Sequence, residues 1–199
     1  PPPPFAHYAL DFNGVDEYIL LPRMVPAMRC VTMWIDIASE QVHLDRSPGY
    51  LVDARYGTVD GFMSDWSIGN LWKDGTLQVD TVSQPVAWDS LPIDRWGHVH
   101  MCASSGFFDN ANVMSSANGN GCLKGRIAEL YVWGFPIPNR ILDRVYNGFD
   151  QVVAFTLMAY YAMEEGQGKA LRDVTGLQED AEVVSSEEEP NWVTGAPEQ

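Results

Sequence analysis

The sequence predicts an all-β fold in which two antiparallel sheets pack as a sandwich, with one short helix. Segments of alternating polar and apolar residues, rich in β-branched and aromatic side chains, recur at short intervals from Leu10 onward. Turn-forming Gly, Pro, Asn and Asp residues separate these segments, and one segment alone has helical periodicity. With 199 residues, 46% of them hydrophobic, the chain is long enough for one sandwich domain with a buried core.

The first predicted strands lie within residues 9–22, on either side of Asn13-Gly14. Asn-Gly is strongly favoured in two-residue hairpins because both residues accept a positive φ. We therefore expect a hairpin or another tight turn at this dipeptide.

The middle of the chain carries most of the strand patterns. They cover residues 31–37, 50–54, 65–68, 77–82, 96–102 and 127–133. The dipeptide Asp74-Gly75 predicts a turn that pairs Leu71-Trp72 with Leu77-Gln78.

The predicted helix covers residues 138–148, where apolar side chains recur at helical spacing and Asn147-Gly148 is a stop signal. Strand patterns return at residues 152–163 and 181–184. Residues 1–4 are four prolines, which favour an extended, semi-rigid arm.

We expect residues 1–4 and 196–199 to be linkers and residues 5–195 to form a single domain. Residues 152–195 are expected to fold back onto that domain, since an unpaired strand at residues 152–163 would expose many apolar side chains. The alternative is that these residues begin the next copy in an array.

The charge of the chain restricts its partners. Its formal net charge is −15, and residues 150–199 carry 11 acidic residues against two basic ones, a balance of −9. Binding to nucleic acid or to an anionic membrane needs clustered Lys and Arg, so we expect neither partner. The longest apolar run, within residues 152–161, is too short to span a bilayer.

Several segments resemble the laminin-G-like branch of the concanavalin A-type jelly roll, a branch distantly related to pentraxins. They are residues 10–22, 30–35, 96–102 and 125–148, and they follow the order of that family. The resemblance implies a two-sheet jelly-roll sandwich, a fold of secreted recognition modules. Residues 157–176 also resemble the family, but their counterpart there precedes the segment that matches residues 10–22, so the order is rotated.

Three cysteines permit one disulfide with one free thiol, or an intermolecular disulfide, and the alternative is three buried, reduced thiols. The resemblance implies that the strands of Cys30 and Cys102 are neighbours, so a Cys30–Cys102 disulfide is expected, with Cys102–Cys122 as the alternative. A disulfide would suit an oxidising compartment. Only nineteen residues separate Cys102 from Cys122, too few for a hairpin that is usual in the family, and this weakens the expectation of lectin activity.

The resemblance implies one possible cofactor, a structural calcium ion held by oxygen atoms of the loops. The matching positions are Asp16 and Asp173. The family's Asn after Gly176 is replaced by Leu177 in this chain. We therefore prefer the alternative interpretation, in which both carboxylates cap turns.

Sugar binding would need exposed indole rings. Trp66, Trp72 and Trp88 lie in irregular regions and are the candidate ligand-binding residues. The alternative is that they pack in the core or in an interface.

Catalysis is not expected. Glycoside hydrolases with a sandwich of this shape carry paired carboxylates at fixed spacing on one strand. Glu164 and Glu165 are adjacent, so on a strand they would face opposite sides of the sheet. His98 and His100 share a strand face, but no nucleophile accompanies them in a recognisable setting.

These features lead us to expect a non-catalytic module at the cell surface or outside the cell, within a larger protein. Its expected work is adhesion or assembly with neighbouring domains or other extracellular proteins. Calcium-dependent glycan binding is the alternative function.

Overall fold

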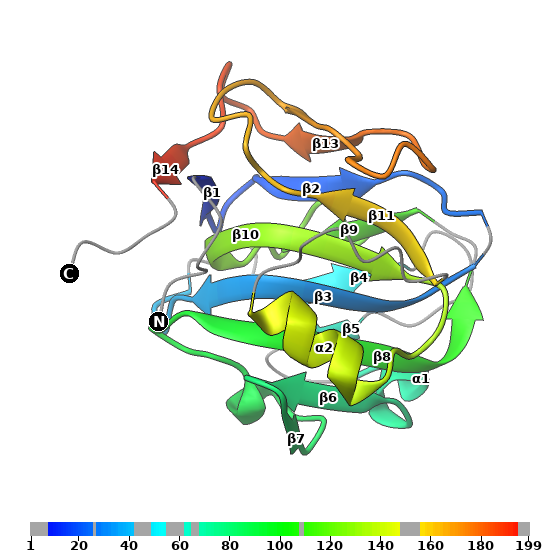
Figure 1. Cartoon of the computed structure of the whole chain (residues 1–199). Helices are drawn as coiled ribbons and strands as arrows, with labels where there is room; N and C mark the ends of the chain where they lie inside the picture. Colours follow the sequence, from blue (N-terminus) through cyan, green and yellow to red (C-terminus); the bar gives the residue numbers. More distant parts are fainter. Residues whose placement is uncertain are drawn as a thin grey trace.

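The computed structural model consists of two antiparallel sheets that pack face to face and do not close into a barrel (Figure 1). It describes residues 8–25, 27–41, 49–54, 62–64, 68–107, 110–147 and 156–194. The all-β sandwich that the sequence predicts is confirmed.

Pairing along the first sheet joins strands from both ends of the chain. Its strands, in spatial order, are β14 (Trp192–Thr194), β1 (Tyr8–Asn13), β10 (Lys124–Trp133), β3 (Met28–Ile37), β8 (Gly97–Phe107), β6 (Thr76–Val79) and β7 (Val82–Gln84), and β11 (Leu157–Tyr161) also pairs with β10. The second sheet holds β12 (Ala170–Leu171), β13 (Ala181–Val184), β2 (Tyr18–Leu21), β9 (Ala111–Val113), β4 (Tyr50–Asp53) and β5 (Phe62–Ser64). The helices of the described residues are α1 (Asn70–Lys73), α2 (Asn139–Tyr146) and the short 3₁₀ helix η1 (Trp88–Ser90).

The main core lies between the two sheets. Alternate residues of the long central strands point inward, among them Val31, Met33 and Val99, and they pack against Ile19 and Val113 of the second sheet. The other face of the first sheet, which we call the outer face, is also buried over much of its area because α2 covers it (Figure 1).

The helix α2 packs through one apolar stripe. Leu142 and Val145 are buried against Tyr131 and Trp133 of the outer face. Because β3, β8 and β10 are covered on both faces, their sequences are apolar or aromatic almost throughout instead of alternating with exposed polar residues.

The turn at Asn13-Gly14 is tight, but it does not make a hairpin. It joins β1 in the first sheet to β2 in the second, so the two strands belong to different sheets. Gly14 has a φ of 77°, and a Cβ there would lie 2.8 Å from Cβ of Lys124. The hairpin interpretation is therefore wrong, although glycine is required at this position.

Two predictions for residues 71–82 are also wrong. Leu71 and Trp72 form part of the helix α1, which the sequence did not predict, and do not pair with β6. The single strand expected at residues 77–82 is interrupted at Asp80-Thr81, where a turn separates β6 from β7. Of the strand expected at residues 65–68, residues 65–67 lie outside the described part of the chain, and Ile68 belongs to no strand.

The C-terminal segment contributes strands to both sheets. β11 pairs with β10, β13 pairs with β2, and β14 pairs with β1 through Leu10 opposite Trp192. β1 and β11 lie along the same side of β10, one beside each half of that strand.

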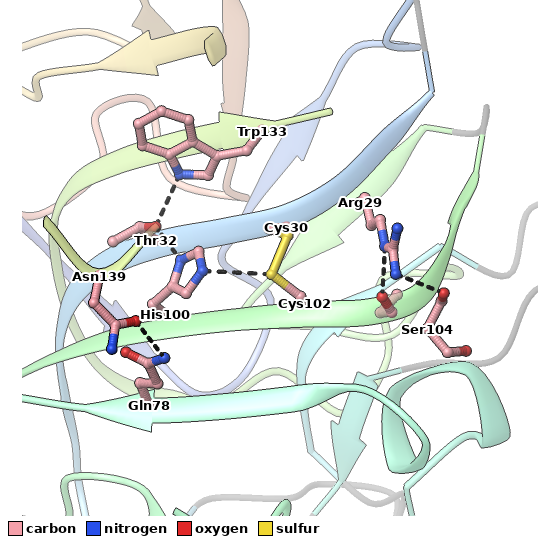
Figure 2. Close-up of a disulfide and its surroundings, with 10 residues drawn as sticks. Arg29, Cys30, Thr32, Gln78, His100, Cys102, Ser104, Trp133 and Asn139 are labelled. Atoms are coloured by element: carbon pink, nitrogen blue, oxygen red, sulfur yellow. Dashed lines mark hydrogen bonds between the residues drawn. A yellow bond between two sulfur atoms is a disulfide. The ribbon is translucent and has the colours of Figure 1, made fainter. Parts of the chain in front are cut away.

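The predicted disulfide is confirmed. Cys30 and Cys102 occupy directly opposite positions of β3 and β8, and their sulfur atoms are bonded on the outer face (Figure 2). Cys122 is buried and forms no disulfide, so the alternative pairing with Cys102 does not occur.

Candidate functional site

Asp173, a predicted calcium ligand, is surrounded by hydrogen-bond donors. Its Oδ1 accepts the backbone N–H groups of Tyr160 (3.0 Å) and Thr175 (3.1 Å). Its Oδ2 accepts those of Leu177 (3.0 Å) and Gln178 (2.9 Å). The hydroxyl of Thr175 lies within 2.9 Å of both oxygens. This geometry is that of a turn cap, because donors already fill the positions around the carboxylate.

Asp16 lies far from Asp173. Its carboxylate accepts the side-chain N–H of Asn13 at 2.8 Å, and hydrogen bonds from Ser186, then from Asn13, lower its pKa. Asp173 contacts Asp180, which directly precedes β13, whereas Ser186 follows β13. The two carboxylates therefore lie near opposite ends of β13. The structure therefore does not bring the two predicted ligands together.

One cluster on the outer face is made of residue types that can bind a metal ion, but its two cysteines are bonded to each other. Among the described residues, only Cys30, His100 and Cys102 place three potential ligand atoms of His, Cys, Asp or Glu within 4.8 Å of one another. Both sulfur atoms belong to the disulfide, so they offer no thiolate to a metal.

A hydrogen-bonded chain fixes the imidazole of this cluster (Figure 2). The indole N–H of Trp133 donates to Thr32 Oγ1 at 2.9 Å, and Thr32 Oγ1 lies 2.7 Å from His100 Nδ1. The arrangement that satisfies all groups has Thr32 donating to Nδ1, which leaves the ring hydrogen on Nε2, 3.4 Å from Cys102 Sγ. Burial lowers the pKa of His100 to about 4, so the ring is neutral at neutral pH.

His98 is buried in an aromatic cluster. Its ring lies 5.2 Å from that of Trp34 and 5.5 Å from that of Tyr146, and neither ring nitrogen has a hydrogen-bond partner in the described part of the chain. Burial, followed by the neighbouring His100, lowers the pKa of His98 to about 3. The two histidines are therefore neutral parts of the packing beneath α2, and the Thr32 hydroxyl that is hydrogen bonded to His100 is fully buried, away from any substrate in solution.

A buried carboxyl group occupies a β-bulge on β10. Glu129 has a φ of 54°, and the register of β10 against β3 shifts at this residue. The hydroxyl groups of Tyr131 and Tyr160 donate to Glu129 at 3.3 Å and 3.5 Å, and their rings stack at 4.3 Å. Burial, only partly offset by these hydrogen bonds, raises the pKa of Glu129 to about 7.

Glu129→Gln is expected to remove a pH-dependent loss of stability. The pKa of Glu129 is raised from 4.5 to about 7 in the folded state, so the folded state binds this proton more tightly than the unfolded state. The stabilisation that results is fully present below pH 4.5 and is lost as the pH rises to about 7. We expect the variant to match the wild type at pH 4.5 and to be more stable by about 3 kcal/mol at pH 8. Urea unfolding at both pH values measures this difference; equal stabilities at pH 8 would contradict the assignment.

The predicted sugar-binding tryptophans do not form one surface. Trp72 is fully buried in the main core, so its ring is not available to a sugar and that prediction is wrong. Trp88 is half-buried and packs against the edge of the core. Trp66 lies outside the described residues.

Glu164 and Glu165 line a hollow of about 450 Å³ with Ala162, Arg172 and Val174. Oε1 of Glu165 accepts the backbone N–H of Arg172 at 2.9 Å. This contact fixes the loop that follows β11.

A larger groove runs beside the edge strand β7, at the lower border of the first sheet in Figure 1. It has a volume of about 700 Å³ and lies between the β6–β7 hairpin and the segment 85–95. The residues that line it are Val79, Asp80, Val82, Gln84, Pro85, Asp89, Ser90, Leu91, Ile93 and Arg95. Val79 and Leu91 are buried at its floor, whereas the side chain of Val82 is 59% exposed.

The hairpin turn beside this groove is built without glycine. Asp80 and Thr81 have φ values of 52° and 65°, as in a type I′ turn. Asp80 is fastened to β8, because its N–H donates to His98 O at 2.8 Å and its Oδ1 accepts the N–H of His98 at 2.9 Å. Its Oδ2 also pairs with Arg95 at 3.0 Å.

Thr81→Gly is expected to stabilise the protein. A β-branched residue with positive φ costs roughly 1–2 kcal/mol, and glycine adds about 0.5–1 kcal/mol of chain entropy, so the gain is about 0.5–1 kcal/mol. Thermal unfolding should show a rise in Tm of about 1–4 °C. Asp80→Gly is the contrast, since it relieves the same backbone cost but loses the contacts to His98 and Arg95; a rise in its Tm too would contradict this account.

Comparison with models of known protein families finds no match, and comparison with curated proteins finds none either. Among the described residues, no helix has the length and apolar character needed to cross a membrane. The sequence did not predict this groove. The groove lies beside the β6–β7 hairpin, and the turn of that hairpin, Asp80-Thr81, lacks the Asn-Gly or Asp-Gly pattern by which a hairpin is recognised.

Proposed function

We propose that this chain is a non-catalytic recognition and assembly module of the laminin-G-like kind, which works outside the cell and binds a neighbouring protein. The observation that carries the proposal is the groove of about 700 Å³ beside the edge strand β7. A groove at a sheet edge, with a few apolar side chains and a polar rim, suits a protein segment better than a small substrate.

The chemistry of the groove supports binding in preference to catalysis. Its titratable side chains are Asp80, Asp89 and Arg95, and Asp80 is already bonded to Arg95 and to the N–H of His98. Asp89 and Ser90 are adjacent, and no base is positioned against the Ser90 hydroxyl among the described residues. The Cys30–Cys102 disulfide supports an oxidising, extracellular location.

Selection from a displayed library of linear peptides tests this proposal. We expect the oxidised wild-type chain to enrich peptides of convergent sequence, and the uncharged change Val82→Ser to weaken their binding. Val174→Ser is the matched control, because Val174 is also 59% exposed but lies away from the groove.

A glycan array, probed with and without a calcium chelator, supplies the opposing outcome. No enriched peptide, together with glycan binding that the chelator removes, would replace protein recognition with a calcium-dependent lectin activity.

A further inference from the structure

We propose that the partner segment binds as an added strand along β7, extending the first sheet, and that it carries lysine or arginine. This inference rests on the proposed function, since it concerns the same groove, and adds the mode of binding and the chemistry of the partner. The occupant to which it commits is an extended basic segment of another protein.

The backbone of β7 provides the first argument. Among the described residues β7 pairs with β6 alone, and Val79 opposite Val82 closes the two-residue turn. The N–H and C=O groups of these two valines therefore face each other, and by alternation those of Ser83 point to the open edge. Ser83 thus offers one donor and one acceptor to an incoming strand.

The side chains beside this edge provide the second argument. Val82 lies opposite the buried Val79 on the inner face of the first sheet, yet the side chain of Val82 is 59% exposed. An added strand would direct alternate side chains into the groove, over Val82 and the buried Leu91. Binding would thus remove an exposed apolar surface from water.

Both walls of the groove are held in place before a partner arrives. Asp80 anchors the hairpin to β8 through its contacts with His98. On the other side, Ile37 of β3 donates to Pro92 O at 3.1 Å, and Asp94 N–H donates to Ile37 O at 2.8 Å. A groove with fixed walls loses little conformational entropy when it binds.

The charge of the partner follows from the groove and from the whole chain. Asp89 is exposed in the lining, and no ion pair or hydrogen bond to its carboxylate is found among the described residues. The net charge of −15 would make two copies of this chain repel each other. A basic partner is attracted on both counts, so it is favoured over a second copy.

The test uses the most enriched linear peptide of the library, made synthetically, and an analogue in which each Lys or Arg becomes Gln. We expect Ser83→Pro to weaken binding of the peptide by at least about tenfold, because it removes the outward N–H. Ser83→Ala is the matched control and should bind like the wild type. Asp89→Asn should weaken binding of the basic peptide several-fold and leave the Gln analogue unchanged.

The outcomes separate this inference from the proposed function. If no peptide is enriched, the proposal that the chain recognises a linear protein segment is wrong, and strand addition is wrong as well. If a peptide binds Ser83→Pro as tightly as Ser83→Ala, strand addition is wrong while protein recognition stands. If the enriched peptides are acidic, or Asp89→Asn leaves the affinity of the basic peptide unchanged, the basic partner is wrong.

Discussion

Replacing both Cys30 and Cys102 by alanine is expected to lower the free energy of unfolding by about 4 kcal/mol. The disulfide joins residues that are 72 positions apart, and a cross-link of this span removes much chain entropy from the unfolded state. Its two sulfur atoms are also buried beneath α2, against Trp133, so the variant loses apolar packing as well.

Thermal unfolding measures this effect, with an expected fall in Tm of about 10 °C. Addition of a phosphine reductant should lower the Tm of the wild type and leave that of the double variant unchanged. Cys122→Ala is the control, because Cys122 is buried but forms no disulfide. An equal loss of stability in this control would show that packing, and not the cross-link, determines the result.

Asp173→Ala is the second change with a large expected effect, a loss of about 4 kcal/mol. The variant leaves the N–H groups of Tyr160, Leu177 and Gln178 without their acceptor at a site where Asp173 is only 4% exposed. Each donor left without a partner costs roughly 1–3 kcal/mol when water cannot reach it.

Asp16→Ala is the matched control, since the sequence offers Asp16 and Asp173 equally as calcium ligands. Asp16 is only half-buried and caps few donors, so its removal should change the stability by about 1 kcal/mol or less. Calcium should leave the Tm of the wild type unchanged. A calcium-dependent rise in Tm that Asp173→Ala abolishes would assign a metal to the site and overturn the turn-cap account.

The sequence predicted the strands that have unambiguous local patterns. β3, β8 and β10 are long and rich in β-branched or aromatic residues, and α2 has apolar residues on one side and a clear stop. These elements form most of the first sheet and its outer cover. The disulfide was expected because the resemblance to the laminin-G-like family implied that two of these strands are neighbours, and the structure pairs them.

Local patterns failed where tertiary contacts determine the conformation. Asn13-Gly14 forms a tight turn, but the choice between a hairpin and a crossing to the second sheet depends on the partners of β1 and β2. Asp80-Thr81 adopts a glycine-like turn because bonds from Asp80 to β8 hold it there. Propensity alone could not show either result.

The sequence predicted the candidate site less well than it predicted the fold. Exposure decides whether a tryptophan can bind a ligand, and Trp72 is buried by contacts that its neighbours in sequence do not reveal. The groove is formed by the edge of β7 and a loop that is tied to β3, so no single motif encodes it. That the chain is a laminin-G-like module stays a proposal, and the sandwich fold and the disulfide are compatible with it.

Amide hydrogen exchange at Ser83 tests the central claim most directly. The account predicts that this amide exchanges rapidly in the free protein, because its N–H points to the open edge of β7. An enriched peptide should slow its exchange at least about tenfold, and the peptide's own alternate amides should become protected with it. Tight binding with unchanged exchange at Ser83 would contradict strand addition and place the partner on another surface.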